Sequence, residues 1–153
     1  MYKNILIPTD GSALSRAAVV NGVQLAQAVG AKVTGFYAAP PATPIEYKGI
    51  FPVKFIAPQK HARMIEKAAA EYLGFIEKTA EKAGVACKTL HVTNDFPAAA
   101  IVAAARREKC DLIFIASHGR RGLAGVLLGS QTQKVLTGSP IPVLVNPGLK
   151  KKS

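Results

Sequence analysis

Residues 111–130 read DLIFIASHGRRGLAGVLLGS, and this stretch predicts a strand followed by a glycine-rich loop. Its first six residues are almost wholly apolar, as expected of a strand that helices cover on both faces. Four glycines follow, interleaved with Arg120 and Arg121. Glycines let the backbone approach a ligand closely, and their N–H groups can form a concavity that binds anions. The loop is therefore either a phosphate-binding loop or an empty tight turn.

Apolar runs alternate with helical patterns along the whole chain. Strands are predicted at residues 2–8, 32–38, 85–92, 111–116 and 142–145. Helices are predicted between them at residues 12–29, 59–83, 96–108 and 131–136. Residues 39–58 hold five of the ten prolines and predict a loop. This alternation is typical of an α/β fold with an open, doubly wound, five-stranded parallel sheet and helices on both faces.

Length and composition limit the classes of protein. The 153 residues suit one domain, which we expect to span residues 1–148 and to end in a basic C-terminal tail at 149–153. No apolar run approaches the ~20 residues of a membrane-spanning helix. The N-terminus does not have the pattern of a signal peptide, so a soluble, cytoplasmic protein without a membrane partner is expected. Cys87 and Cys110 lack metal-site spacing and are expected to be free, buried thiols.

The charge distribution favours an anionic partner. The formal net charge is +11, and no Asp or Glu occurs from residue 112 to the end. A field of one sign attracts anions. Nucleic acid is not the expected anion, because no stacking aromatic residues accompany these charges.

Strand ends locate a candidate site. Open parallel sheets bind ligands outside the carboxyl ends of their strands, where the strand order reverses. The residues at these ends are Pro8, Thr9, Asp10, Ala38 and Ala116. If the first and fourth strands are neighbours, their ends face one crevice. Ser130 begins the next helix, where its hydroxyl would cap the helix or meet a phosphate oxygen.

The glycine motif resembles that of the universal stress protein family, whose nucleotide-binding members have G-x2-G-x9-G-[ST] after the fourth strand. The match runs from Ala116 through Gly119 to Gly129 and Ser130. The segments IPTDGS at the first strand and PIPVLV at the last strand are also similar. The resemblance implies an adenine nucleotide alpha hydrolase-like fold. It also implies a homodimeric stress-response sensor or regulator that binds ATP or another adenine nucleotide.

Carried over by position, the resemblance assigns roles to single residues. The backbone near Pro8 and the Asp10 side chain would line the nucleotide site, and the Ala38 backbone would meet the adenine. The residues that would wrap the ribose and phosphates are Ala116, Ser117, His118, Gly119, Arg120 and Arg121. The residues that would meet the phosphates at the helix start are Gly129, Ser130 and Gln131. A Mg²⁺ or Mn²⁺ ion bridging the phosphates would have Asp10 as its nearby carboxylate. The family's dimers imply pairing through the last strand, here Pro142 to Val145.

Three residues leave alternatives open. Ala116 replaces the first motif glycine: it is harmless in extended backbone and strained where φ must be positive. The strained case would make the protein a dimeric stress adaptor that binds no nucleotide. Asp10 would orient a ligand or cap the first helix. For His118 we expect a structural hydrogen bond within the loop. No catalytic constellation is evident, so we expect a binding protein with at most slow ATP hydrolysis and not an enzyme.

Overall fold

A computed structural model describes residues 1–41, 45–119 and 128–148, and only the backbone of residues 45–48 and 51–55. The predictions for Arg120, Arg121 and the tail at 149–153 lie outside the described residues. Five strands form one all-parallel sheet, in the order β5-β2-β1-β6-β7. Their bounds are β1 Asn4–Pro8, β2 Lys32–Ala39, β5 Cys87–Thr93, β6 Leu112–Ala116 and β7 Val143–Asn146. The predicted five-stranded parallel sheet is confirmed.

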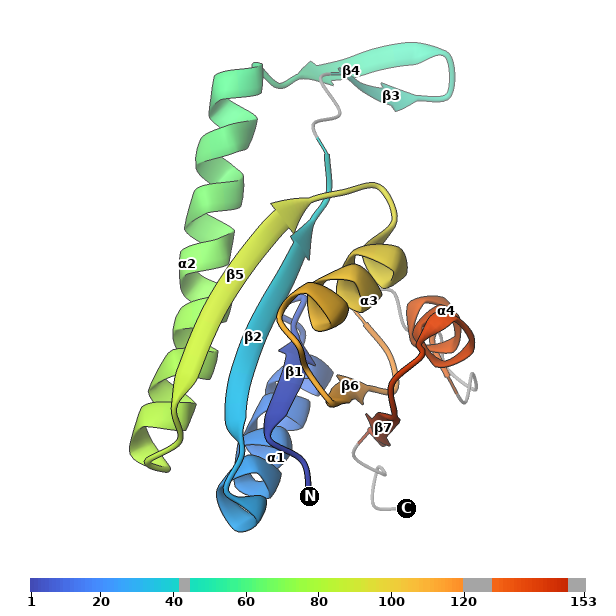
Figure 1. Cartoon of the computed structure of the whole chain (residues 1–153). Coiled ribbons are helices and arrows are strands. Elements are labelled where there is room, and N and C mark those ends of the chain that lie inside the picture. Colours follow the sequence, from blue (N-terminus) through green and yellow to red (C-terminus); the bar gives the residue numbers. More distant parts are fainter. Residues whose placement is uncertain (42–44, 120–127, 149–153) are drawn as a thin grey trace, which may run out of the picture.

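Two helices cover each face of this sheet (Figure 1). The helices are α1 Ala13–Val29, α2 Pro58–Lys82, α3 Pro97–Arg107 and α4 Ser130–Gly138. Along β1, Ile5 and Ile7 pack with α1 and α2, whereas Leu6 packs with α3 and α4. Successive side chains of a strand point to opposite faces, so a strand covered on both faces must be apolar throughout. This requirement explains why β6, with the sequence LIFIA, and residues 5–7 of β1 are apolar throughout.

The proline-rich segment is not a plain loop, and the prediction for residues 39–58 was wrong in this respect. Strands β3, Ile45–Lys48, and β4, Phe51–Phe55, form an antiparallel hairpin. Figure 1 shows this hairpin beyond the carboxyl end of β2, before the start of α2. Both strands of a two-stranded ribbon are edge strands, where the missing N–H of a proline such as Pro52 is tolerated. Proline content therefore misled the prediction, because it argues only against central strands.

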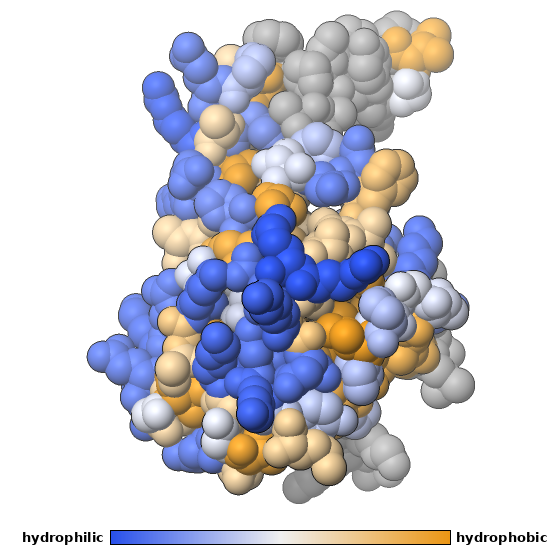
Figure 2. Space-filling view, viewed as in Figure 1, coloured by the Kyte–Doolittle hydropathy of each residue, from blue (hydrophilic) through white to orange (hydrophobic). Residues whose placement is uncertain are grey.

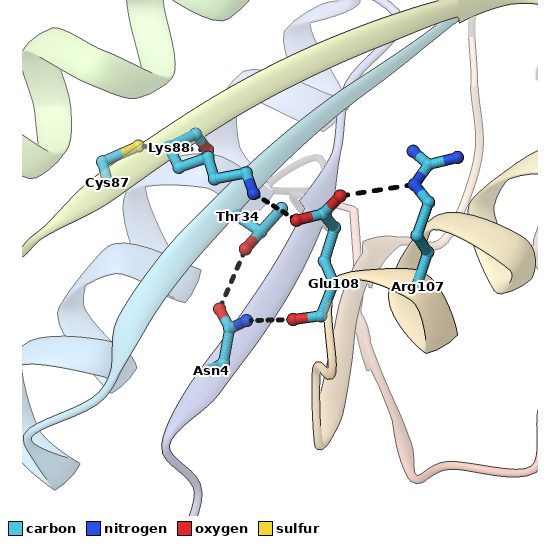
Figure 3. A network of polar contacts seen from close by, with 6 residues as sticks. All are labelled: Asn4, Thr34, Cys87, Lys88, Arg107 and Glu108. Carbon is cyan, nitrogen blue, oxygen red and sulfur yellow. Dashed lines mark hydrogen bonds and ion pairs between the residues drawn. The ribbon is translucent and has the colours of Figure 1, made fainter.

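A polar network connects the end of α3 to the amino ends of β1, β2 and β5, on the side of the sheet away from the hairpin (Figure 3). The Asn4 side-chain amide donates to the Glu108 carbonyl at 3.0 Å. Thr34 Oγ1 donates to Asn4 Oδ1 at 2.9 Å. The Glu108 carboxylate lies between Lys88 and Arg107 and forms an ion pair with each. Three strands and one helix are thus joined by polar contacts on this side of the molecule.

Glu108→Gln should produce a pH-dependent loss of stability. The hydrogen bond from Lys88 is the main cause that holds the pKa of Glu108 below its ordinary value of 4.5. A carboxylate with a lowered folded-state pKa stabilises the protein fully above its unfolded pKa and loses this effect as pH falls through the folded pKa. The variant should be less stable than the parent at neutral pH, and the difference should shrink below about pH 4.5. Urea unfolding across this pH range tests the expectation. Glu81→Gln, at an exposed position of α2, is the control. A stability difference between Glu108→Gln and the parent that stays equal at every pH would contradict the expectation.

The two cysteines are free, as predicted. Cys110 is buried, but Cys87 is only half-buried. Burial raises the pKa of both thiols, and the Glu77 carboxylate raises that of Cys87 further, to about 11. Both side chains therefore remain protonated at neutral pH, the state in which a thiol is a poor nucleophile.

Candidate functional site

The order of the sheet defines where a ligand would bind. From β1 the chain continues to β2 and β5 on one side, and later returns to β6 and β7 on the other. The strand order therefore reverses between β1 and β6. These two strands are hydrogen-bonded neighbours, which is the condition for their ends to face one crevice. In open parallel sheets the crevice at the carboxyl ends of two such strands is the usual binding site.

Three segments that lie far apart in the sequence meet at this crevice. Asp10 Oδ2 is only 2.6 Å from the position that a Cβ on Gly119 would take. The N–H of Gly129 donates to the Ser117 carbonyl at 2.7 Å. A Cβ on Gly129 would lie 3.2 Å from His118 Cα. The residues after β6 and the start of α4 are therefore packed backbone to backbone, and the Asp10 side chain that follows β1 lies against Gly119.

Asp10 organises the turn that leads into α1, but it does not cap the helix. Its Oδ1 accepts a hydrogen bond from the Ser12 N–H at 2.9 Å. Ser12 is the N-cap residue, and its side chain accepts from the Ser15 N–H at 3.2 Å. The second carboxylate oxygen of Asp10 lies on the Gly119 side. One side chain thus joins the first turn of the chain to the glycine loop.

Pro8 and Thr9 are packing residues of this edge. Pro8 is the buried last residue of β1. Thr9 is also buried, and its N–H donates to the Phe36 carbonyl of β2 at 2.9 Å. The Thr9 hydroxyl is 3.2 Å from that of Ser15, inside the protein. Ala38, two residues beyond Phe36, is half-buried at the carboxyl end of β2. A ligand at the crevice would therefore meet the backbone of Thr9 and not its hydroxyl.

Ala116 occupies extended backbone as the last residue of β6. Among the residues that the structure describes, Lys109 is the single non-glycine residue with a positive φ. Ala116 is therefore unstrained, and the strained alternative for this position does not hold. Its side chain is buried, and its carbonyl accepts a hydrogen bond from Thr132 Oγ1 at 2.8 Å. This buried bond holds α4 against the end of β6.

Thr132→Val should lower the free energy of unfolding by about 1–3 kcal/mol, because the buried Ala116 carbonyl would lose its donor. Sequence reasoning missed Thr132, since a threonine in the first turn of a helix gives no local sign of a distant acceptor. Thr137→Val is the matched control in the same helix, because its hydroxyl bonds exposed carbonyls one turn earlier. Urea unfolding of both variants is the measurement. Equal losses of unfolding free energy in the two variants would mean that the bond to Ala116 stabilises the protein no more than the exposed bonds of Thr137 do.

The remaining predicted residues take different orientations. Ser117 is buried, and its Oγ lies 3.1 Å from His118 Nδ1, so the loop has the internal hydrogen bond expected of His118. Gly129 is the N-cap residue of α4, without a side-chain cap bond, and Ser130 is exposed and does not cap the helix. Gln131 is turned toward α3, where its Oε1 accepts the Ala98 N–H at 3.3 Å. Only the backbone of Gln131 is thus oriented for a role in the crevice.

At the crevice the start of α4 offers N–H groups to an anion. The first N–H groups of a helix have no partner within the helix, and the helix dipole makes this end partly positive. In the described ranges 1–41, 45–119 and 128–148, no group of three His, Cys, Asp or Glu side chains could hold a metal ion. None of the helices in the same ranges is long and apolar enough to cross a membrane. In the described part of the crevice, the N–H donors at the start of α4 and the Asp10 carboxylate are groups that a ligand would meet.

Known proteins are similar to this chain in both fold and sequence. The universal stress protein family model matches residues 1–147, so the chain belongs to the universal stress protein family. Universal stress protein MJ0531 of Methanocaldococcus jannaschii is 31% identical over 99% of this chain and 86% of its own. The structure of hypothetical protein MJ0577, a universal stress protein of the same organism, superimposes with a TM-score of 0.78 at 25% identity, covering 99% of each chain. A universal stress protein in complex with cAMP has a TM-score of 0.66 at 27% identity and covers 95% of this chain and 97% of its own.

Proposed function

We propose that the protein binds ATP or a related adenine nucleotide in the crevice between β1 and β6, and acts as a homodimeric stress-response sensor or regulator. The main support is the meeting of Asp10, residues 117–119 and Gly129 at the point where the strand order reverses. The similar universal stress protein that was solved in complex with cAMP supports an adenine nucleotide as the ligand.

The chemistry of the crevice fits a nucleotide. The phosphates would lie at the start of α4, where the N–H groups of the first turn and the helix dipole favour anions. The Asp10 carboxylate would accept hydrogen bonds from ribose hydroxyls or bind a Mg²⁺ or Mn²⁺ ion on the phosphates. Backbone groups near Ala38 would meet the adenine. Arg120 and Arg121 would add charge-assisted hydrogen bonds to the phosphates.

A binding role agrees better with these residues than catalysis does. Hydrolysis of ATP needs a residue that positions water and a clamp on the γ-phosphate. His118 is held by Ser117 through its Nδ1, and Asp10 is held by the Ser12 N–H. Both side chains thus have structural partners already, and we infer a protein that responds to a bound nucleotide and does not turn it over rapidly.

Calorimetric titration of the nucleotide-free protein with ATP and magnesium tests the proposal. We expect saturable binding in the micromolar range, weakened at least about tenfold by Asp10→Asn. Circular dichroism of both proteins shows whether they are folded. No heat from a folded, nucleotide-free parent would overturn the proposal and leave a dimeric adaptor in which the crevice is a structural turn.

The homodimer would form through β7, as part of the same proposal. This strand is an edge of the sheet, and Leu144 on it is 40% exposed. Unpaired edge strands with apolar side chains tend to pair with another chain, and charges on them prevent it. Light scattering during gel filtration should show a dimer for the parent and a monomer for Leu144→Lys. A monomeric parent, or a variant that remains dimeric, would contradict pairing through β7.

A further inference from the structure

A groove of about 630 Å³ lies between α3 and α4, outside the proposed nucleotide site. The two helices lie side by side on the face opposite α1 and α2 (Figure 1). Residues of both helices line it, including Phe96, Ala99, Val102, Ala103, Arg106 and Lys134. Gln131 also lines it, and its side chain is turned toward α3 and away from the crevice. The groove is therefore a separate surface that begins near the crevice and follows the helices away from it.

The floor of the groove is apolar. Ala99 and Ala103 are exposed residues one turn apart on α3, with Val102 half-buried beside them. Such small side chains let another segment come close to the helix backbone. At the start of α3, Phe96 is 71% exposed. Exposed aromatic residues beside an apolar floor are common anchors of protein interfaces.

Two cations stand on opposite walls of this apolar floor. Arg106 projects from α3 and Lys134 from α4, and both are exposed. In the part of the chain that the structure describes, neither is in an ion pair. The one acidic residue of the lining, Asp95, lies at the other end, before α3. Figure 2 shows apolar surface next to strongly hydrophilic surface over these helices. The groove thus selects an occupant that is apolar on one side and negatively charged.

We propose that the groove between α3 and α4 docks an acidic amphipathic helix of a partner protein. Three observations define this partner: an apolar floor, a cation on each wall, and an overall charge of +11 that would attract acidic segments. The α3 wall from Phe96 to Arg106 spans about 15 Å, which matches three turns of a bound helix. The proposal does not depend on whether the crevice binds a nucleotide.

A labelled peptide measures this docking by fluorescence anisotropy. The probe has about fourteen residues, with leucines at helical spacing on one face and glutamates on the other. Two further probes separate the sources of binding: the same residues in an order without an apolar face, and a short single-stranded oligonucleotide. Amide chemical shifts of the labelled protein then report where the peptide binds.

Matched variants separate docking from general attraction between charges. Arg106→Glu with Lys134→Glu reverses the two walls, and Lys67→Glu with Lys78→Glu makes the same charge change on exposed positions of α2. Ala103→Gln fills the floor without changing the charge. We expect the first pair to weaken binding at least about tenfold, the control pair less than about twofold, and Ala103→Gln severalfold.

Four results would overturn the proposal. They are no binding of the amphipathic peptide up to about 1 mM, equal weakening by the two charge-reversed pairs, equal binding of the peptide without an apolar face, and shift changes outside α3 and α4. Oligonucleotide binding in the groove with the same response to the variants would assign this surface to nucleic acid instead. Because nucleotide binding by the crevice is measured separately with ATP, failure of one proposal is distinguishable from failure of the other.

Discussion

Gly11→Ala is expected to lower the free energy of unfolding by about 2–4 kcal/mol, the largest effect of any single substitution considered for this protein. Gly11 has a φ of +78°, a conformation that is costly for residues with a Cβ. A Cβ at this position would also lie 2.3 Å from the Tyr72 ring. Tyr72 packs edge-on against Tyr37, with ring centroids 5.2 Å apart, so the ring has little freedom to move away.

Gly30→Ala is the matched control for this substitution. Gly30 has a similar φ of +73°, but apart from its own chain neighbours no atom of the described residues lies within 4 Å of its added Cβ. It should cost only about 1 kcal/mol, the conformational part of the effect. Urea unfolding of the two variants thus separates backbone strain from collision with Tyr72. Equal losses for both would mean that the ring moves freely and that the close packing of the turn after β1 is unimportant.

Gly129→Ala is expected to weaken ATP binding at least about tenfold, or about 1.4 kcal/mol, with a smaller effect on stability. The backbone of Gly129, with φ −66° and ψ 155°, suits alanine, so strain is not the cause. Its Cβ would press on His118 Cα at 3.2 Å and on the Ser117 carbonyl at 3.4 Å. These are backbone atoms, so relief requires that the start of α4 move away from residues 117–119. The N–H donors of the helix would then no longer meet phosphates held by the crevice.

Gly138→Ala in the same helix controls for the change of residue type, because outside its own helix no atom of the residues that the structure describes lies within 4 Å of its added Cβ. This variant should bind ATP as the parent does. Calorimetric titration of the parent and both variants, with unfolding curves to show that each is folded, is the required experiment. Unchanged affinity for Gly129→Ala would place the nucleotide elsewhere or show that the start of α4 does not touch it.

Much of the fold was predictable because each element has its own local pattern. Buried parallel strands must be apolar on both faces, so the run at 111–116 was recognisable as a strand without any knowledge of its neighbours. Helical spacing and end signals located α1, including Gly30 as the residue that ends it. The hairpin of β3 and β4 was missed, because pairing between two edge strands is compatible with the prolines that indicated a loop.

The candidate site was predictable as a set of segments and not as a set of side-chain roles. Strand ends and the glycine motif indicated one crevice on the condition that the first and fourth predicted strands are neighbours, and the structure shows that they are. The orientation of Gln131 toward Ala98 could not be inferred, because it depends on the packing of two helices that are distant in sequence. The hydrogen bond from Thr132 to the buried Ala116 carbonyl could not be inferred either, because it depends on how α4 packs against the end of β6.

By itself the sequence determined the α/β class, the succession of the five sheet strands and the four helices, and the segments that form the candidate crevice. These features follow from the spacing of apolar residues and glycines, which acts over a few neighbouring positions. Only the tertiary structure decided that Ala116 is unstrained, that Ser12 and not Asp10 caps α1, and that α3 and α4 leave a groove between them. The groove and the extended backbone of Ala116 depend on how helices and strands that are far apart along the chain pack together. The Ser12 cap is a hydrogen bond between residues three apart, and the local sequence left open whether Asp10 or Ser12 would make it.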